Sequence, residues 1–209
     1  VAYTHQGYET TYRVMANDSQ QGKALGQYAA KLGKRVAVVD DRTAYGQGLI
    51  DEVVKAVKAS GAEIVGREYT TDKSTDFTAI LTSIKSKRPD VVVFGGMDPQ
   101  AAPMVRQMRT LGMTIPFMGG DGMQSAELIK LAGSSAEGVI GSSPGLPLAD
   151  MPGGATFAKR YTERFGKIQI YAPFAHDAAE VLIQAMLKAD SAEPEKYLPE
   201  LAKTRIDGV

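Results

Sequence analysis

The stretch Val36–Val54, VAVVDDRTAYGQGLIDEVV, consists of an apolar run, a loop with two glycines and a segment of helical period. This order is typical of a strand, turn and helix that bind a nucleotide phosphate. A dinucleotide-binding loop needs a third glycine, but Asp51 stands at that position, and its charge in the first helical turn would repel a phosphate. The chain also lacks a G-x-x-x-x-G-K-[ST] motif. The stretch therefore predicts a strand, loop and helix whose loop binds something other than phosphate.

The same alternation continues along the chain. Short apolar and β-branched runs, the form that strands buried on both faces take, recur in its middle part. They are Val36–Val39, Ile64–Tyr69, Val91–Phe94, Ile115–Met118 and Val139–Gly141. Between these runs, apolar residues recur at helical spacing, as in Leu49, Val53 and Val57. This alternation of strand and helix predicts an α/β fold with a doubly wound parallel sheet.

Glycine and serine mark the predicted helix ends. Gly33, Gly61 and Gly112 each follow a helical segment, where a residue with left-handed backbone commonly closes a helix. Ser74 precedes the third helical segment and is predicted to cap its N-terminus.

The composition argues against several classes of protein. The 24 Lys and Arg residues equal the 24 Asp and Glu residues, so we expect no nucleic-acid partner. The chain has no cysteine, hence no disulfide, thiolate metal site or cysteine nucleophile. No apolar run approaches the about 20 residues of a membrane-spanning helix. We expect no cofactor and no metal.

The sequence offers little machinery for catalysis. Asp40 and Asp41 follow a predicted strand, where a carboxylate pair could hold Mg²⁺ or accept a phosphoryl group, and His5 and His176 are the only histidines. H-E-x-x-H and G-x-S-x-G motifs are both missing. We favour capping of the following loop and helix as the role of both aspartates, and we expect no catalytic residues and no enzyme activity.

The loops after the predicted strands supply groups suited to binding. Ligands of an open parallel sheet bind beyond the carboxyl ends of its strands, where this chain has Tyr45, Met97 and Asp121 among several glycines. A ring, a thioether and a carboxylate suit a small ligand with an apolar part and a cationic amine. Each residue also has a structural alternative: loop packing for Tyr45, core filling for Met97 and capping of the helix near Ser125 for Asp121. Taken together, the three favour a binding site.

Six segments of the chain resemble the type I periplasmic binding proteins of ABC transporters, specifically the leucine/isoleucine/valine-binding branch. They are NDSQQG (17–22), DDRTAYGQG (40–48), DFTAILTSIKSKRPDVVVFGG (76–96), QMRTLGMTIPFMGGDG (107–122), SAEGVI (135–140) and YAPFAHDAAEVLIQAM (171–186). They follow the order of the family and cover nearly the whole chain. The resemblance implies two lobes that close over an amino acid, which is then delivered to a membrane permease.

The resemblance also implies where the ligand binds. The implied ligand-binding residues are Ala44, Tyr45, Gly46, Met97, Asp121 and Tyr171. Asp121 would accept from the α-ammonium group, and Tyr171 lies near the place of an aromatic residue that covers the ligand. Met97 departs from the family pattern, which has an aromatic residue there, and Asp121 replaces a Glu. Branched-chain amino acids are therefore the leading ligands, while other amino acids and small carboxylates remain open.

The resemblance divides the chain into parts of two lobes. Residues 12–145 would form a complete Rossmann-like α/β lobe, the second of the family. Residues 146–209 would form a crossing segment and a mainly helical part of the first lobe. Its predicted helices are Ala155–Phe165, Phe174–Ala189 and Pro194–Lys203. Since the family carries most of its first lobe ahead of Val1, we expect a truncated form whose open apolar face is covered by a second chain or fragment.

The family implies a location and partners as well. The location would be the periplasm, or the outside of a Gram-positive cell through a lipid anchor. The partners would be a small amino acid and the permease of an ABC transporter. A ligand-sensing receptor domain of the same fold is the alternative, because it would bind its ligand in the same way.

Overall fold

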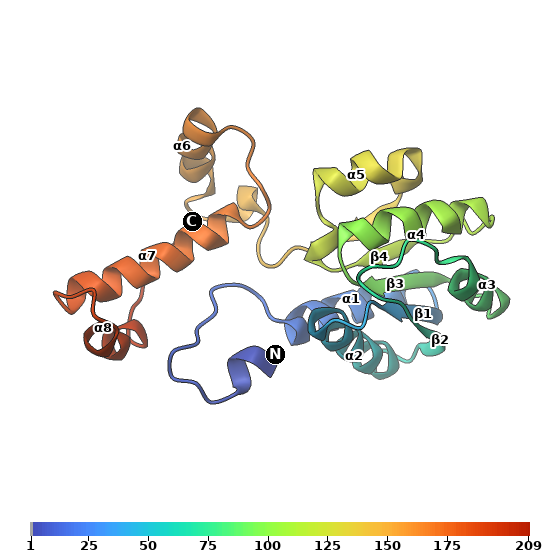
Figure 1. The fold of residues 1–209 in the computed structure, drawn as a ribbon, viewed down its shortest axis with the longest axis horizontal. Helices are drawn as coiled ribbons and strands as arrows, with labels where there is room; N and C mark the ends of the chain where they lie inside the picture. Colours follow the sequence, from blue (N-terminus) through green and yellow to red (C-terminus); the bar gives the residue numbers. More distant parts are fainter. Residues whose placement is uncertain (1) are drawn as a thin grey trace. The chain divides into compact units, whose positions relative to one another are not determined.

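The computed structural model describes residues 2–209, which form two compact units (Figure 1). The α/β unit comprises residues Asn17–Pro144, and the helical unit comprises Ala2–Ala16 together with Gly145–Val209. Residues 12–16, which the sequence analysis groups with the α/β region, thus cluster with the helical unit.

A parallel sheet with the strand order β2-β1-β3-β4-β5 forms the centre of the α/β unit. The strands are β1 (Arg35–Asp40), β2 (Glu63–Tyr69), β3 (Val91–Gly95), β4 (Phe117–Gly119) and β5 (Val139–Gly141). β4 begins two residues later than the predicted run from Ile115, because Pro116 has no N–H to donate to a neighbouring strand. The predicted doubly wound α/β fold is confirmed.

Helices cover both faces of this sheet (Figure 1). One face packs against α1 (Asp18–Leu32) and α2 (Ala44–Ala59), and the other against α3 (Thr78–Ser86), α4 (Asp98–Thr110) and α5 (Ala126–Ala132). Successive side chains of a strand point to opposite faces. In β1, Val36 and Val38 therefore join the core under α1 and α2, whereas Ala37 and Val39 join the core under the other helices. Burial on both faces explains why the strands read as continuous apolar runs.

Glycines allow α1 and α2 to approach closely. A Cβ atom at Gly22 would lie 2.5 Å from Cβ of Glu52. One at Gly26 would lie 2.6 Å from Cβ of Ala56 and 2.7 Å from the carbonyl oxygen of Val53. Real atoms do not approach at these distances, so the contact requires glycine at both positions. This packing fixes α2, whose first turn carries candidate site residues.

Two of the three predicted glycine helix ends are confirmed. Gly61 and Gly112 have the left-handed φ values of 71° and 74°. Gly33 has an extended φ of −175°, so the left-handed prediction is wrong for it. A Cβ atom at Gly33 would lie 2.1 Å from Cβ of Asp90, whose carboxylate accepts hydrogen bonds from the two N–H groups after Gly33, at 2.8 and 2.9 Å. Close approach to Asp90 is therefore the reason for this glycine.

The predicted N-cap at Ser74 is wrong. α3 begins at Thr78, and the side chain of Ser74 instead contacts Thr71, with 2.9 Å between the hydroxyl oxygens. Asp76 accepts a hydrogen bond from the backbone N–H of Thr78 at 2.9 Å, and this bond lowers the pKa of the Asp76 carboxyl. The Asp76 carboxylate thus binds the first N–H of α3, while Phe77 occupies the N-cap position without a side-chain hydrogen bond.

The helical unit contains the elements predicted after the crossing segment. They are α6 (Gly154–Phe165), α7 (Ala172–Lys188) and α8 (Pro194–Leu201). Two 3₁₀ turns that were not predicted, η1 (Ala2–His5) and η4 (Leu148–Asp150), precede them in the chain. Aromatic rings connect α6 with α7: Phe157 lies 5.4 Å from Tyr161 and 5.4 Å from His176 between ring centroids. The α/β unit also has two 3₁₀ turns, η2 (Asp121–Met123) and η3 (Gly133–Ala136).

Ion pairs and open apolar surface characterise α7. Lys188 and Lys203 lie 2.9 and 3.1 Å from the carboxylate of Glu200 on α8, and both lower the pKa of that carboxyl. On α7 itself, Ile183 and Leu187 are 50% and 68% exposed. Exposed apolar residues of the kind predicted for the partial first lobe therefore lie on α7.

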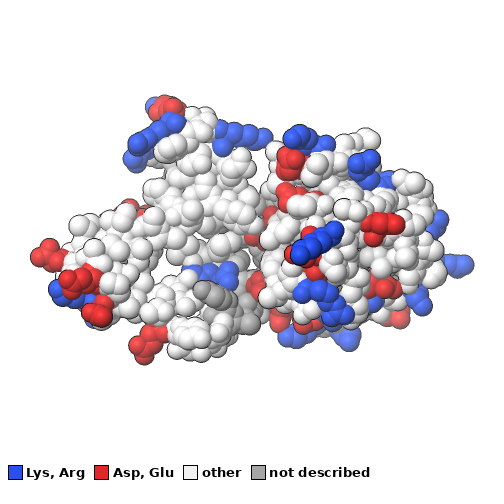
Figure 2. Space-filling view, viewed as in Figure 1, with Lys and Arg blue, Asp and Glu red and all other residues white. Residues whose placement is uncertain are grey.

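The described surface carries both signs of charge. Figure 2 shows Lys and Arg interspersed with Asp and Glu over the displayed face of the α/β unit. None of the helices in residues 2–209 combines the length and the apolar character that crossing a bilayer requires.

Candidate functional site

The loops beyond the carboxyl ends of β1 and β4 meet at one edge of the sheet, because parallel strands end on the same side. The hydroxyl of Tyr45, in the first turn of α2, donates to Oδ1 of Asp121 at 2.9 Å. Asp121 opens η2 directly after β4 and is only 7% exposed. The structure therefore brings together two candidate residues that are 76 positions apart in the sequence.

The loop that carries Tyr45 is held by its own polar side chains. Oδ1 of Asp41 accepts from the backbone N–H of Thr43 at 3.0 Å and from its hydroxyl at 2.6 Å. The Thr43 oxygen in turn accepts from the N–H of Gly46 at 3.0 Å and caps α2. A Cβ atom at Gly46 would lie 2.5 Å from the carbonyl oxygen of Gly95, so this turn packs directly on the end of β3. The favoured role of Asp41 is therefore confirmed for the loop, whereas the following helix is capped by Thr43.

Because α2 begins at Ala44, Asp51 lies well inside the helix and not in its first turn. Its carboxylate pairs with Arg67 at 2.7 Å. Burial lowers the pKa of Arg67, but the hydrogen bond and the charge of Asp51 outweigh it, so that this pKa is raised overall. Buried Asp40 lies 3.5 Å from the same guanidinium and accepts from the N–H of Arg42 at 3.2 Å. Asp41 therefore stabilises the loop by hydrogen bonds, and Asp40 does so by a hydrogen bond and an ion pair.

The geometry distinguishes between the alternative roles of the candidate residues. Asp121 does not cap α5, because Ser125 is the N-cap and accepts from the N–H of Leu128 at 3.0 Å. Met97 is 43% exposed, so it does not fill the core. Tyr45 does pack against the core under α1 and α2, and it makes its hydrogen bond in addition.

Met97 lies beside the loop of Asp121. It precedes α4 as the N-cap residue, and a Cβ atom at Gly122 would lie 2.5 Å from its sulfur. Ala44 and Gly46 flank Tyr45 in the first turn of α2. The α/β unit thus groups five of the six candidate residues around the ends of β1, β3 and β4.

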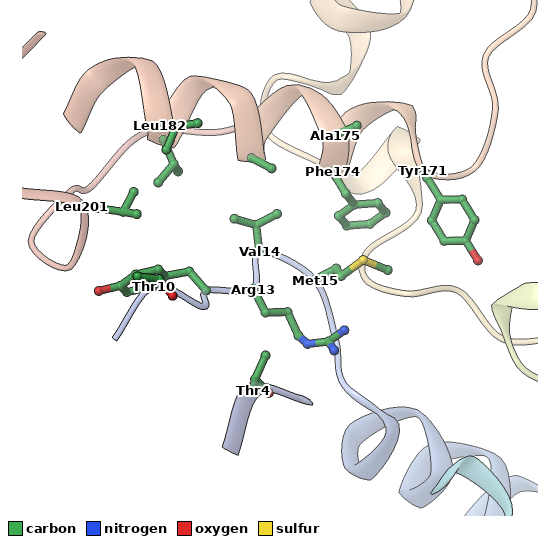
Figure 3. Close-up of a pocket in the computed structure, with 13 residues that line it drawn as sticks. Thr4, Thr10, Arg13, Val14, Met15, Tyr171, Phe174, Ala175, Leu182 and Leu201 are labelled. Carbon is green, nitrogen blue, oxygen red and sulfur yellow. The ribbon is translucent and has the colours of Figure 1, made fainter. Parts of the chain in front are cut away.

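Tyr171 belongs to the helical unit. It is 40% exposed and stands immediately before α7. With Phe174, Val14 and Met15 it lines a largely apolar hollow of about 530 Å³ between α7 and the N-terminal segment of the same unit (Figure 3).

Sequence reasoning missed Gln21. This residue is buried on α1, and its Oε1 accepts from the hydroxyl of Ser142 at 3.4 Å, just after β5. The same oxygen lies 3.4 Å from the place that a Cβ atom at Gly120 would occupy. The available signal was the spacing of Gln21, Leu25 and Ala29, which puts an amide on the buried stripe of a helix.

The described residues contain no cluster of three or more His, Asp or Glu side chains that could hold a metal ion. What the strand ends offer is a buried carboxylate, a phenol that donates to it and a flexible thioether. Such a set can bind the ammonium group of a small ligand and contact its apolar part.

Comparison with known proteins gives consistent matches. The chain matches the family model for periplasmic binding proteins over residues 3–209. Leu/Ile/Val-binding protein homolog 1 of Brucella melitensis is 34% identical over 196 residues, which are 93% of this chain and 53% of that protein. The chain thus spans about half the length of the curated relatives that it matches.

Solved structures of similar proteins share the fold. The leucine-binding protein LivK of Thermotoga maritima matches with a TM-score of 0.88 at 30% identity, over 98% of this chain and 61% of that one. The substrate-binding protein LivJ of Streptococcus pneumoniae, solved in complex with isoleucine, matches with a TM-score of 0.79 at 27% identity, over 92% of this chain and 57% of that one.

Proposed function

The chain belongs to the periplasmic binding protein family, and from this premise we propose that it contributes one side of an amino-acid-binding cleft in the solute-binding protein of an ABC transporter. The family is one of solute-binding proteins, and the proposal involves no catalytic step. The bound amino acid would be handed to a membrane permease. The periplasm, or the outer cell surface through a lipid anchor, is the proposed location.

The observation that carries this proposal is the Tyr45–Asp121 pair at the carboxyl edge of the sheet. A buried carboxylate is costly unless it is hydrogen-bonded or paired with a charge. Asp121 accepts from Tyr45 and would pair with the α-ammonium group of the ligand. Ala44, Gly46 and Met97 would line the remaining surface on this side.

The ligand that we propose is a small amino acid of the branched-chain type. The names of the Brucella and Thermotoga relatives, and the isoleucine bound to the Streptococcus protein, support this class. The thioether of Met97 would contact an aliphatic side chain, because methionine adapts to irregular apolar shapes. Tyr171 would approach the ligand from the other lobe.

The division into lobes is part of the same proposal. The α/β unit, Asn17–Pro144, would act as the second lobe, and the residues after it as part of the first. The exposed apolar residues of α7 support this assignment, because such a face is normally buried. We propose that further polypeptide, from the same protein or a second chain, covers it.

The test is calorimetric titration of leucine into the full-length gene product and its Asp121→Asn variant. Asn keeps the shape of the side chain and can still accept from Tyr45, but it removes the charge that would face the ammonium group. We expect a loss of roughly 2 to 5 kcal/mol, or about 30-fold to several thousandfold in Kd. Asp72→Asn is the matched control, since Asp72 is exposed in a loop. Equal affinities of Asp121→Asn and the unchanged protein would contradict the proposal.

A further inference from the structure

The hydroxyl group of Tyr45 donates to Asp121, while the residue itself packs against the core under α1 and α2. Resting on the proposed amino-acid-binding function, we propose that Tyr45 is a positioning residue whose phenol holds the Asp121 carboxylate in the orientation that receives the ammonium group of the ligand.

The first support is the hydrogen bond itself. The donor comes from the first turn of α2 and the acceptor from the turn after β4, so that the 2.9 Å contact joins two separate elements. The terminal torsion of an aspartate is broad, so a fixed donor restricts an orientation that the side chain alone does not define. A carboxylate has about four lone-pair sites on its two oxygens. Asp121 can therefore accept from the phenol and from an ammonium group at the same time.

The second support is the space reserved for the hydroxyl. A Cβ atom at Gly120 would lie 2.2 Å from the hydroxyl oxygen of Tyr45 and 2.8 Å from Cδ2 of Leu49. Any larger residue at position 120 would displace the phenol from the carboxylate next to it. The glycine thus leaves room for the hydroxyl immediately before Asp121 in the chain.

The third support is the rigidity of the element that carries the phenol. α2 is capped by Thr43 and packs against α1 at Gly26. Binding groups are positioned most accurately when they stand on rigid helices and strands. The donor is thus fixed by the fold, while Asp121 stands on a short turn that benefits from being held.

A positioning role for the Tyr45 hydroxyl predicts a different effect of substitution than a role in which the Tyr45 ring only contacts the apolar part of the ligand. If Tyr45 acts through its ring, Tyr45→Phe leaves binding intact for every ligand. If it acts through its hydroxyl, Tyr45→Phe weakens the binding of ligands that carry an amine and leaves the binding of other ligands unchanged. The two roles can therefore be separated by one substitution and two ligands.

The experiment measures binding of leucine and of isocaproate, which is leucine without its amino group, to the full-length gene product. We expect Tyr45→Phe to raise the Kd of leucine roughly tenfold, as for the loss of a hydrogen bond to a charged group. The Kd of isocaproate should stay within about twofold of its value for the unchanged protein. In an Asp121→Ala background, Tyr45→Phe should change leucine binding by less than about twofold, because the group that it positions is gone. Tyr28→Phe is the matched control, since it removes an exposed phenol from α1.

A second variant keeps the phenol and moves it. Gly120→Ala should give the same selective loss of leucine binding, whereas Gly66→Ala should not, because a Cβ atom there finds its nearest neighbours at 3.8 and 3.9 Å. Thermal melting shows whether Tyr45→Phe or Gly120→Ala fails to fold. If one of them does, leucine binding by the other tests the positioning role of Tyr45.

The outcomes separate the inference from the function on which it rests. If the unchanged protein binds no amino acid, the proposed function fails and the inference fails with it. If leucine binds but Tyr45→Phe has no effect, or weakens both ligands equally, or acts equally without Asp121, the positioning role alone is overturned.

Discussion

Gly26→Ala should destabilise the α/β unit, although alanine is the better helix former. In an isolated helix, this substitution is favourable by about 0.8 to 1 kcal/mol. Here the added Cβ would lie 2.6 Å from Cβ of Ala56 and 2.7 Å from the carbonyl oxygen of Val53. The second of these atoms is backbone and cannot rotate away, so α1 must move outward as a whole.

The magnitude follows from two opposing effects. Ordinary contacts of a Cβ atom lie between 3.4 and 4 Å, so the helices must separate by close to 1 Å at this point. Overpacking of this kind costs roughly 1 to 3 kcal/mol. After the gain in helix propensity, we expect a net destabilisation of up to about 2 kcal/mol, which lowers the melting temperature by up to about 8 °C in a chain of this size.

The assay is urea unfolding followed by circular dichroism, with Gly48→Ala as the matched control. Gly48 lies in α2, and a Cβ atom there would meet the far end of the flexible Asp18 side chain at 3.3 Å. This control should be neutral or slightly stabilising, because helix propensity dominates where the neighbour can move. If Gly26→Ala proves as stable as Gly48→Ala, the requirement for a small residue between α1 and α2 is refuted.

The helical unit provides two further tests. Because the pKa of Glu200 is lowered by hydrogen bonds from Lys188 and Lys203, its contribution to stability is present above its ordinary pKa of 4.5 and is lost as the pH falls through the lower pKa of the folded state. Glu200→Gln should therefore make the loss of stability below about pH 5 shallower in acid titrations followed by circular dichroism, and superimposable profiles would contradict the assignment. Because α7 exposes Ile183 and Leu187, light scattering of the purified 209-residue chain should give a mass above that of one chain. A clean monomer would argue against a partner on this face.

Structural features that depend only on residues close together in the chain were predictable from the sequence. The alternation of short apolar runs with helical spacing gives the parallel α/β fold, because burial on both faces removes polar residues from the strands. The left-handed ends at Gly61 and Gly112 are local in the same sense, since they depend on the backbone freedom of one residue. The resemblance of separate motifs to one family adds the expected place of the ligand.

Features that depend on which elements become neighbours were decided by the tertiary structure. The extended backbone of Gly33 follows from the approach of Asp90, which no local pattern indicates. The contact of Tyr45 with Asp121 requires β1 and β4 to end at the same edge of the sheet with only β3 between them, and a glycine in front of Asp121 to leave room for a hydroxyl. The sequence by itself determined the periodicities and the chemical groups at the strand ends. Their hydrogen bond was decided by packing, because distances between residues far apart in the chain exist only once the sheet has formed.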